Sequence, residues 1–333
     1  MMITGKVRRT MLAGVASLVL LSACGTDSSS DADDGGGGDA SGAFPVTIEH
    51  AYGETEIAEE PERVVSLGYT EQDSILAFGV VPVGVRYAFG PEDDVFFPWA
   101  DEAAGDAEPE IMPRAEVDFE AVAALEPDLI MAVTAGLTED EYETLSQIAP
   151  TVVQPEEFKA FGTPWQEQTR ITGRALGQEE RAEELIAEVE ALFEETRAEF
   201  PQLDGRTFTL SGTSYEGEYP FNASDDTRAR FFVDLGMSVP AEQDEIAGDQ
   251  FFGTVSREEA RLLAADVLLF QSGSDEERAG IEGDPVLTAL PAFAEGRVLF
   301  VEGSDYDALQ FASVLSLPYL LENLVPELAE IVG

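Results

Sequence analysis

Apolar and polar residues follow two different periods along residues 44–333, and these periods predict strands and helices in alternation. The strands predicted from short β-branched or apolar runs are residues 63–67, 80–85, 129–133, 207–211, 267–271 and 298–301. The helices predicted from a three-to-four spacing of apolar residues are 71–78, 118–125, 138–148, 226–235, 256–264 and 308–323. A β-hairpin is predicted over 46–57, around Tyr52-Gly53. This alternation predicts an α/β protein with largely parallel sheets covered by helices.

Residues 164–201 carry no strand signal and predict a long helical connection. Pro164 suits a first helical turn, Gly177 marks a break, and Pro201 ends the run. The apolar stripe after the break consists of Ala182, Leu185, Ile186, Val189, Leu192, Phe193 and Phe200. A helix of roughly 23 residues spans about 35 Å. We therefore expect a stiff helical spine between an N-terminal lobe at 44–163 and a C-terminal lobe at 202–333.

A weak internal repeat supports two lobes. Residues 117–130 and 255–268 both read as a capped helix followed by a strand, with Asp118 or Ser256 at the N-cap and an acidic residue in the first turn. Any capped helix before a strand has a similar pattern, so coincidence is the alternative explanation.

The N-terminal segment has the features of an export signal. Lys6, Arg8 and Arg9 precede a short apolar stretch at 11–21, which is too short for a membrane span but suits a signal peptide. Residues 21–24, Leu-Ser-Ala-Cys, resemble a bacterial lipobox, so we expect a signal peptide at 1–23 and lipid attachment at Cys24. An ordinary signal peptide with a chance cysteine is the alternative. The segment 24–43, almost free of large apolar residues, is expected to be a flexible linker that reaches on the order of 25 Å.

Composition removes several classes of function. The 67 acidic and 18 basic residues give a formal charge of −49, which repels nucleic-acid backbones. One cysteine excludes a disulfide framework, and one histidine, His50, excludes a site with several histidines. We expect His50 to be structural. The sequence contains no phosphate-binding G-x-x-x-x-G-K motif and no G-x-S-x-G motif.

Four further segments carry a resemblance to a known family: 61–67 (PERVVSL), 126–130 (EPDLI), 173–177 (GRALG) and 324–328 (LVPEL). With the lipobox and the spine, they resemble the substrate-binding lipoproteins of bacterial iron–siderophore ABC importers, a family that includes vitamin B12-binding proteins. The resemblance covers about residues 46–333. It implies two Rossmann-like lobes joined by a rigid helix, with one ligand in the cleft between them.

The same resemblance implies a non-enzymatic function. The protein would capture a ferric siderophore outside the cytoplasmic membrane and deliver it to a permease dimer. We expect a lipid-anchored monomer without a cofactor, in which iron arrives only within the ligand. Heme and cobalamin are alternative ligands. A lipid-anchored hydrolase that uses two carboxylates is the alternative among enzymes, and a scaffolding lipoprotein is a third possibility.

Ligands of open α/β sheets bind beyond the carboxyl ends of the strands, which selects the candidate residues. Guanidinium groups suit oxygen-rich ferric complexes, and aromatic rings complete such a site. The predicted ligand-binding residues are Tyr69, Arg86, Tyr87, Trp99, Arg114, Tyr215, Arg228, Arg230 and Tyr306. Surface ion pairs and ordinary core packing are the alternative roles. Arg63 and Trp165 are expected to be structural.

The family resemblance also implies one permease-docking glutamate on each lobe. The matching positions are Glu120 and Glu258, which are equivalent in the internal repeat, and the adjacent Glu259 could replace Glu258. The alternative role for both is stabilisation of a helix N-terminus.

Overall fold

The computed structural model describes residues 43–89, 95–114 and 116–333. The predicted signal peptide 1–23, the lipidation site Cys24 and nearly all of the linker 24–43 lie outside the described residues. The described chain begins with the predicted hairpin, in which β1 (Val46–His50) pairs antiparallel with β2 (Gly53–Ile57). Within the described ranges, no helix is long and apolar enough to cross a membrane.

The first lobe is built on a five-stranded parallel sheet in the spatial order β5-β4-β3-β6-β7. Its strands are β3 (Val64–Ser66), β4 (Gly84–Arg86), β5 (Glu110–Met112), β6 (Leu129–Ala132) and β7 (Thr151–Val153). Its helices are α1 (Glu71–Ala77), α2 (Asp101–Ala104), α3 (Phe119–Ala124) and α4 (Glu139–Leu145). Numbered along the chain, the strands are ordered 3-2-1-4-5, so the direction of winding reverses between β3 and β6, as in Rossmann folds.

The second lobe repeats this order in the sheet β10-β9-β8-β11-β12. Its strands are β8 (Phe208–Ser211), β9 (Glu218–Asn222), β10 (Phe252–Ser256), β11 (Val267–Gln271) and β12 (Val298–Val301). Its helices are α7 (Thr227–Asp234), α8 (Ala241–Ala247), α9 (Asp275–Gly283), α10 (Pro291–Ala294) and α11 (Gly303–Gln310), with a 3-10 helix η3 (Arg257–Leu263). The strands β8, β11 and β12 are parallel, whereas β9 is antiparallel to β8 and β10. The reversal in this sheet falls between β8 and β11.

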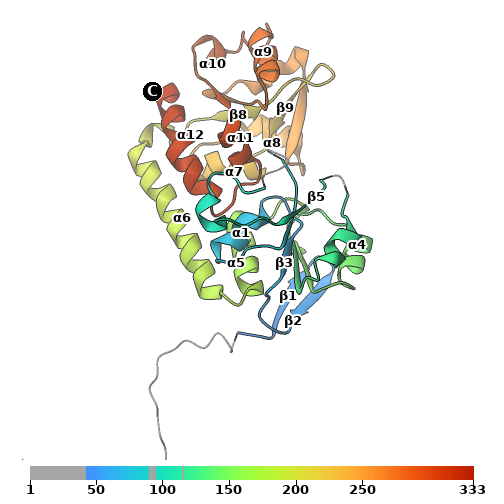
Figure 1. Ribbon diagram of the computed structural model, residues 1–333. Helices are drawn as coiled ribbons and strands as arrows, with labels where there is room; N and C mark the ends of the chain where they lie inside the picture. Colours follow the sequence, from blue (N-terminus) through green and yellow to red (C-terminus); the bar gives the residue numbers. More distant parts are fainter. Residues whose placement is uncertain (1–42, 90–94, 115) are drawn as a thin grey trace, which may run out of the picture. The chain divides into compact units, whose positions relative to one another are not determined.

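The spine connects the lobes as two helices, α5 (Trp165–Ala175) and α6 (Glu179–Glu199), followed by the short 3-10 helix η2 (Pro201–Leu203). Gly177 lies at the break with a φ of +69°, which glycine adopts without a Cβ penalty. Figure 1 shows α6 running beside the last helix, α12 (Ser316–Val332). One continuous hydrophobic cluster includes Val64 of the first sheet, Val189 of α6 and Leu269 of the second sheet. The two lobes therefore share a core.

Several sequence predictions are wrong in detail. The strand predicted at 80–85 begins only at Gly84, because α1 ends in a turn at Phe78 and Gly79 and residues 80–83 form an irregular connection. The helix predicted at 308–323 is divided at Phe311 into α11 and α12, and the helix predicted at 256–264 is of the 3-10 type. Leu192, assigned to the buried stripe of α6, is 38% exposed. The strands β5, β7, β9 and β10 were not predicted.

Candidate functional site

The point of strand reversal in the first sheet is organised by a buried carboxylate. Glu71, the first residue of α1, accepts hydrogen bonds from the backbone N–H of Gly68 at 2.8 Å and of Thr134 at 2.9 Å. It thereby joins the loops that follow β3 and β6. Burial raises the pKa of Glu71 to about 7, although these backbone hydrogen bonds act in the opposite direction. A Cβ on Gly68 would lie 2.2 Å from Oε2 of Glu71, so the close approach requires glycine.

Arg86 is the last residue of β4, and Arg114 lies two residues after the adjacent strand β5, on the same side of this reversal point. Arg86 is 8% exposed, and its guanidinium donates to the carbonyl oxygens of Arg114, at 2.8 and 3.2 Å, and of Ala135, at 3.4 Å. It also lies 5.5 Å from the centre of the Tyr69 ring. Arg114 itself is exposed and makes no ion pair with a described carboxylate. Arg86 is thus held by its neighbours, whereas the Arg114 side chain remains available to a ligand.

Four aromatic rings form a group that includes residues from both lobes. The Tyr69 ring stacks on Phe161 at 5.6 Å between centres and meets Phe311 edge-on at 5.2 Å. Phe89 also stacks on Phe311, at 6.3 Å between centres. We call Tyr69, Phe89, Phe161 and Phe311 the aromatic floor. Because Phe311 belongs to the second lobe and the other three belong to the first, the floor lies between the lobes.

The second lobe contributes Arg228 and Tyr306 opposite Arg114. The guanidinium of Arg228 is paired with the N-cap carboxylate of Asp226 at 2.8 Å. The pKa of Tyr306 is raised, first by burial and next by the charge of Glu277, while the charges of Arg228 and Arg114 act to lower it. An arginine from each lobe therefore lies near the same phenol.

Two cations also bridge the lobes. Arg230 of α7 donates to the carbonyl oxygen of Gly162 at 2.9 Å. Lys159, in the first lobe, donates to the carbonyl oxygen of Asp249 and lies 5.6 Å from the centre of the Phe251 ring. Neither cation forms an ion pair with a carboxylate within the described part of the chain.

The remaining predicted ligand residues have mixed surroundings. Trp99 stacks on Phe97 at 4.7 Å and donates through Nε1 to Asp73 at 2.7 Å, and its ring lies 5.4 Å from that of Tyr319 in α12, so it is held by the packing between the lobes. Tyr87 is half-buried after β4, and its backbone N–H donates to Met112. Tyr215 is 75% exposed at the loop between β8 and β9.

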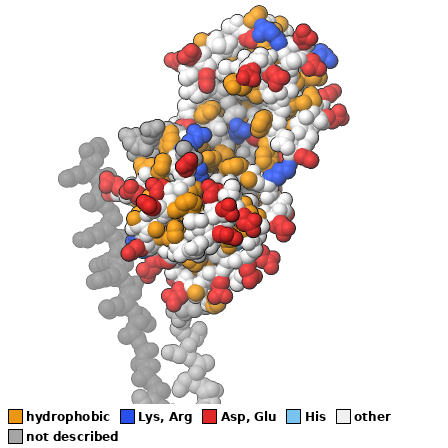
Figure 2. Space-filling model, turned by 90° about the vertical axis from the view of Figure 1, so that its right-hand side faces the viewer, with side chains coloured by type: hydrophobic (Ala, Val, Ile, Leu, Met, Phe, Trp, Pro, Cys, Tyr) orange, Lys and Arg blue, Asp and Glu red, His pale blue; other side chains and the backbone are white. Residues whose placement is uncertain are grey.

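The structure thus brings Tyr69, Arg86, Arg114, Arg228 and Tyr306 to facing ends of the two sheets. Figure 2 shows Lys and Arg side chains gathered with hydrophobic side chains along the hollowed band between the lobes, whereas acidic side chains dominate the outer surfaces. Sequence reasoning did not select Phe89, Phe161, Phe311 or Lys159. Phe161 has a φ of +67°, and no sequence signal announces this left-handed conformation at a phenylalanine.

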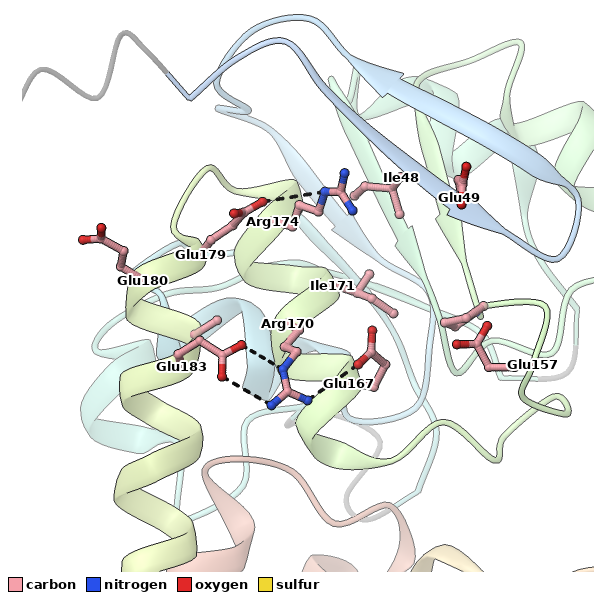
Figure 3. Close-up of a pocket in the computed structure, with 12 residues that line it drawn as sticks. Ile48, Glu49, Glu157, Glu167, Arg170, Ile171, Arg174, Glu179, Glu180 and Glu183 are labelled. Carbon is pink, nitrogen blue, oxygen red and sulfur yellow. Dashed lines mark hydrogen bonds and ion pairs between the residues drawn. The ribbon is translucent and has the colours of Figure 1, made fainter.

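A second depression, drawn in Figure 3, lies between the β1–β2 hairpin and helices α5 and α6. Its two arginines are already paired: Arg170 with Glu167 and Glu183, and Arg174 with Glu179. These pairs are exposed, so solvent screens them and each contributes little to stability. The depression therefore presents mainly carboxylates and lies apart from the aromatic floor.

The residues expected to be structural have structural contacts. Arg63 donates to the carbonyl oxygens of Leu125 and Glu126, and Trp165 is 8% exposed within the shared core. His50 is buried and lies 2.9 Å from the hydroxyl of Thr55. Among the described residues, no group of His, Cys, Asp and Glu side chains is arranged to hold a metal ion.

Glu120 and Glu258 are both exposed. Glu120 follows the N-cap Asp118, which accepts from the backbone of Ala121 at 2.9 Å. In the second lobe Ser256 does not cap a helix with its side chain, contrary to expectation; its hydroxyl donates to Glu259 at 2.9 Å. Of the two adjacent glutamates, Glu259 is therefore engaged and Glu258 remains accessible.

Comparisons with known proteins agree with this architecture. A crystal structure of a periplasmic solute binding protein from Mycobacterium smegmatis is 37% identical, covers 86% of this chain and 99% of that chain, and has a TM-score of 0.79. The structure of PiaA from Streptococcus pneumoniae in complex with ferrichrome is 28% identical, covers 86% and 98%, and has a TM-score of 0.76. The Bacillus subtilis protein named "Probable siderophore-binding lipoprotein YfiY" is 26% identical over 76% of this chain and 75% of its own length.

The family model described as "Periplasmic binding protein" matches residues 64–303, which include strands of both sheets and the whole spine. The match confirms the predicted class, a binding protein rather than an enzyme, and removes the hydrolase alternative. The two lobes joined by a long helix likewise confirm the predicted fold. The chain belongs to the periplasmic binding protein family.

Proposed function

We propose that this protein captures a ferric siderophore between its lobes and delivers it to the permease of an ABC importer. The observation that carries the proposal is a group of side chains from both lobes: exposed Arg114 of the first lobe and half-buried Arg228 of the second lie near the half-buried phenol of Tyr306. Guanidinium and phenol groups suit the oxygen atoms that surround chelated iron, and the aromatic floor suits the organic scaffold of the chelator. The relative bound to ferrichrome has the same fold, which supports this class of ligand.

Tryptophan fluorescence tests this function directly. The chain has two tryptophans, and Trp99 lies beside the interlobe face, stacked on Phe97. Titration with ferrichrome, ferrioxamine B, ferric dicitrate and a ferric catecholate should give saturable quenching with at least one complex. The iron-free chelators and an equal concentration of tryptophan amide serve as controls for absorption by the ligand. Absence of saturable binding to every ferric complex, with binding of heme or cobalamin instead, would replace the proposed ligand by one of those alternatives.

The permease is proposed to bind through Glu120 and Glu258, one on each lobe. Both carboxylates are exposed, and Glu120 borders a surface depression lined by Val117 and Phe119. In the second lobe, Arg257 binds Asp284 at 3.1 Å and so fixes the start of η3 beneath Glu258. The double variant Glu120→Ala, Glu258→Ala should bind ligand and melt like the parent but should not support uptake by cells.

A matched control for that experiment is Glu139→Ala with Glu276→Ala, since these are also exposed acids in first helical turns. The control should retain uptake. If the Glu120/Glu258 variant retains uptake at equal expression, the two glutamates are only structural.

We also propose that the protein is anchored to the cell membrane through a lipid on Cys24, facing outward. The lipobox-like Leu-Ser-Ala-Cys at 21–24 supports this, as does the name of the Bacillus subtilis relative. Labelling of growing cells with a radioactive fatty acid should mark the parent chain and not the Cys24→Ser variant.

A further inference from the structure

A carboxylate with no role in the proposed ligand site lies buried where the two lobes meet. Asp73 of α1 is 0% exposed, and its Oδ2 atom accepts two hydrogen bonds. One comes from Nε1 of Trp99 at 2.7 Å, in the same lobe. The other comes from the hydroxyl of Ser313 at 2.6 Å, which lies 240 residues further along the chain, between α11 and α12 of the second lobe.

The bond from Ser313 has a fixed direction. The Ser313 hydroxyl oxygen accepts from the backbone N–H of Ser316 at 3.0 Å, and the Ser313 backbone N–H donates to the hydroxyl of Ser316 at 2.9 Å. The hydroxyl proton of Ser313 therefore points to Asp73. Because Ser316 is the first residue of the 17-residue helix α12, Asp73 also faces the positive end of that helix.

The other oxygen of Asp73 lacks such support. Oδ1 is buried, and no hydrogen-bond partner for it exists among the described residues. No described Lys or Arg pairs with the carboxylate. A buried charge with an unpaired oxygen is unfavourable, and burial raises the pKa of Asp73 to about 6, although the bonds from Ser313 and Trp99 act to lower it.

We propose that Asp73 is a proton-dependent latch between the lobes, which holds residues 311–315 on α1 when neutral and favours their release when charged. Water that enters a loosened interface would solvate both carboxylate oxygens. The closed interface cannot do so, because Oδ1 has no partner there. The closed state therefore binds the proton more tightly, and by linkage loss of the proton favours opening.

The latch acts on the candidate ligand site through Phe311. Its carbonyl oxygen accepts from the hydroxyl of Thr70 at 2.7 Å, and its ring belongs to the aromatic floor. When residues 311–315 lie on α1, the Phe311 ring of the second lobe thus completes the aromatic floor. The inference concerns the empty protein and does not depend on the identity of the ligand.

The other charged groups on the elements around Asp73 either have hydrogen-bond or ion-pair partners of their own or lie at the surface. On α1, Glu71 is held by Gly68 and Thr134. Residues 95–99 contain no titratable side chain, and α2 carries Asp101 and Glu102, both exposed. The charged residues of α5 line the depression of Figure 3. From α12, Tyr319 lies 5.4 Å from Trp99, with Asp305 of α11 beside it.

The indole N–H of Trp99 reports directly on Asp73. The protein has two tryptophans, so a nitrogen-15 spectrum contains two indole signals, which Trp99→Phe assigns. Between pH 5 and 8 the Trp99 signal should titrate with a midpoint near 6, and that of Trp165 should stay constant. The titration should vanish in Asp73→Asn and persist in Glu71→Gln. An unchanged Trp99 signal in the folded parent, or the same titration in Asp73→Asn, would overturn the proposal.

Hydrogen exchange tests the opening itself. Protection of residues 311–316, corrected for intrinsic exchange rates, should fall about ten-fold from pH 5 to pH 7. This factor follows if the pKa of Asp73 is about 6 in the closed state and has the ordinary value of about 3.9 in the open state. Helix α6 serves as an internal reference. Ser313→Ala should weaken protection and move the Trp99 midpoint to higher pH, because the lost bond favours the charged form. Equal or greater protection at pH 7 would contradict the latch.

Discussion

At the scale of single residues, Arg86 and Arg114 show that neighbouring arginines have different roles. The Arg86 guanidinium is buried and bonded to two carbonyl oxygens, whereas that of Arg114 is exposed. The backbone carbonyl of Arg114 that holds Arg86 is independent of the side chain at position 114. The two side chains are therefore separable by mutation.

Arg114→Ala should weaken binding of the ferric ligand without lowering the melting temperature. Loss of a charge-assisted hydrogen bond costs about 1.5–3 kcal/mol, equivalent to roughly a ten- to hundred-fold loss of affinity. Arg86→Ala should lower affinity and melting temperature together, because it also removes buried hydrogen bonds. Fluorescence titration with parallel thermal melts would measure both effects. Parent-like affinity in both variants would show that these arginines do not bind the ligand.

Glu71 should make stability depend on pH. Its pKa is raised to about 7 in the folded protein, above the ordinary value of 4.5, so the folded state binds the proton more tightly. Its stabilising contribution is therefore complete at low pH and is lost as the pH rises to about 7. The slope can reach about 1.4 kcal/mol per pH unit.

Urea unfolding of the parent and of Glu71→Gln at pH 5, 6 and 7 would measure this dependence. Glutamine lacks one of the two acceptors used by Gly68 and Thr134, so the variant should be less stable throughout. Its stability should nevertheless fall less steeply with pH. Equal slopes would show that Glu71 does not titrate in this range.

At the scale of elements, the sequence pattern predicted continuous apolar runs and the glycine break in the spine best. The strands at 267–271 and 298–301 and the break at Gly177 agree with the structure, because apolar runs and glycine act locally. Phe311 ends α11 and contacts Tyr69 of the other lobe, a contact that no local signal contains. The predicted site residues on strand ends could be selected by topology, but the aromatic floor depends on tertiary packing and could not.

The break in the spine gives a prediction at this scale. Gly177→Ala should destabilise the protein by about 1–2 kcal/mol, because φ is +69° and a Cβ would lie 2.7 Å from the Phe44 ring. Gly280→Ala in α9 is the matched control, since its Cβ would meet open space and alanine favours helix by up to about 1 kcal/mol. Denaturant midpoints should move in opposite directions. A shift in the same direction for both variants would contradict the claim that the backbone conformation at position 177 requires glycine.

At the scale of the whole molecule, the shared core limits how far the lobes can move. Helix α6 buries Leu185, Ile186 and Val189 in the same cluster as residues of both sheets. Wide hinge bending would have to break this cluster throughout, whereas local loosening at residues 311–315 would involve one of its buried members, Val314. Motion on ligand binding should therefore be small.

X-ray scattering from the empty and ligand-saturated protein should give nearly superimposable profiles. The expected change in radius of gyration is below about 1 Å, because a rigid helical connection resists hinge closure. A flexible two-domain binding protein measured in the same way provides the comparison. A clear decrease on ligand addition would show that the shared core permits domain closure.

The position of α12 in the shared core has a consequence for how the chain acquires its structure. Leu320, Leu324 and Leu328 of this last helix are almost completely buried in the cluster that also contains Val64 and α6. During synthesis or export from the N-terminus, about 260 residues after Val64 must emerge before these side chains arrive. The hydrophobic core of the first lobe is therefore incomplete until the last helix has been added. A truncated chain that lacks α12 should therefore be degraded rather than accumulate as a folded first lobe, because its unburied apolar surface leaves it open to proteolysis.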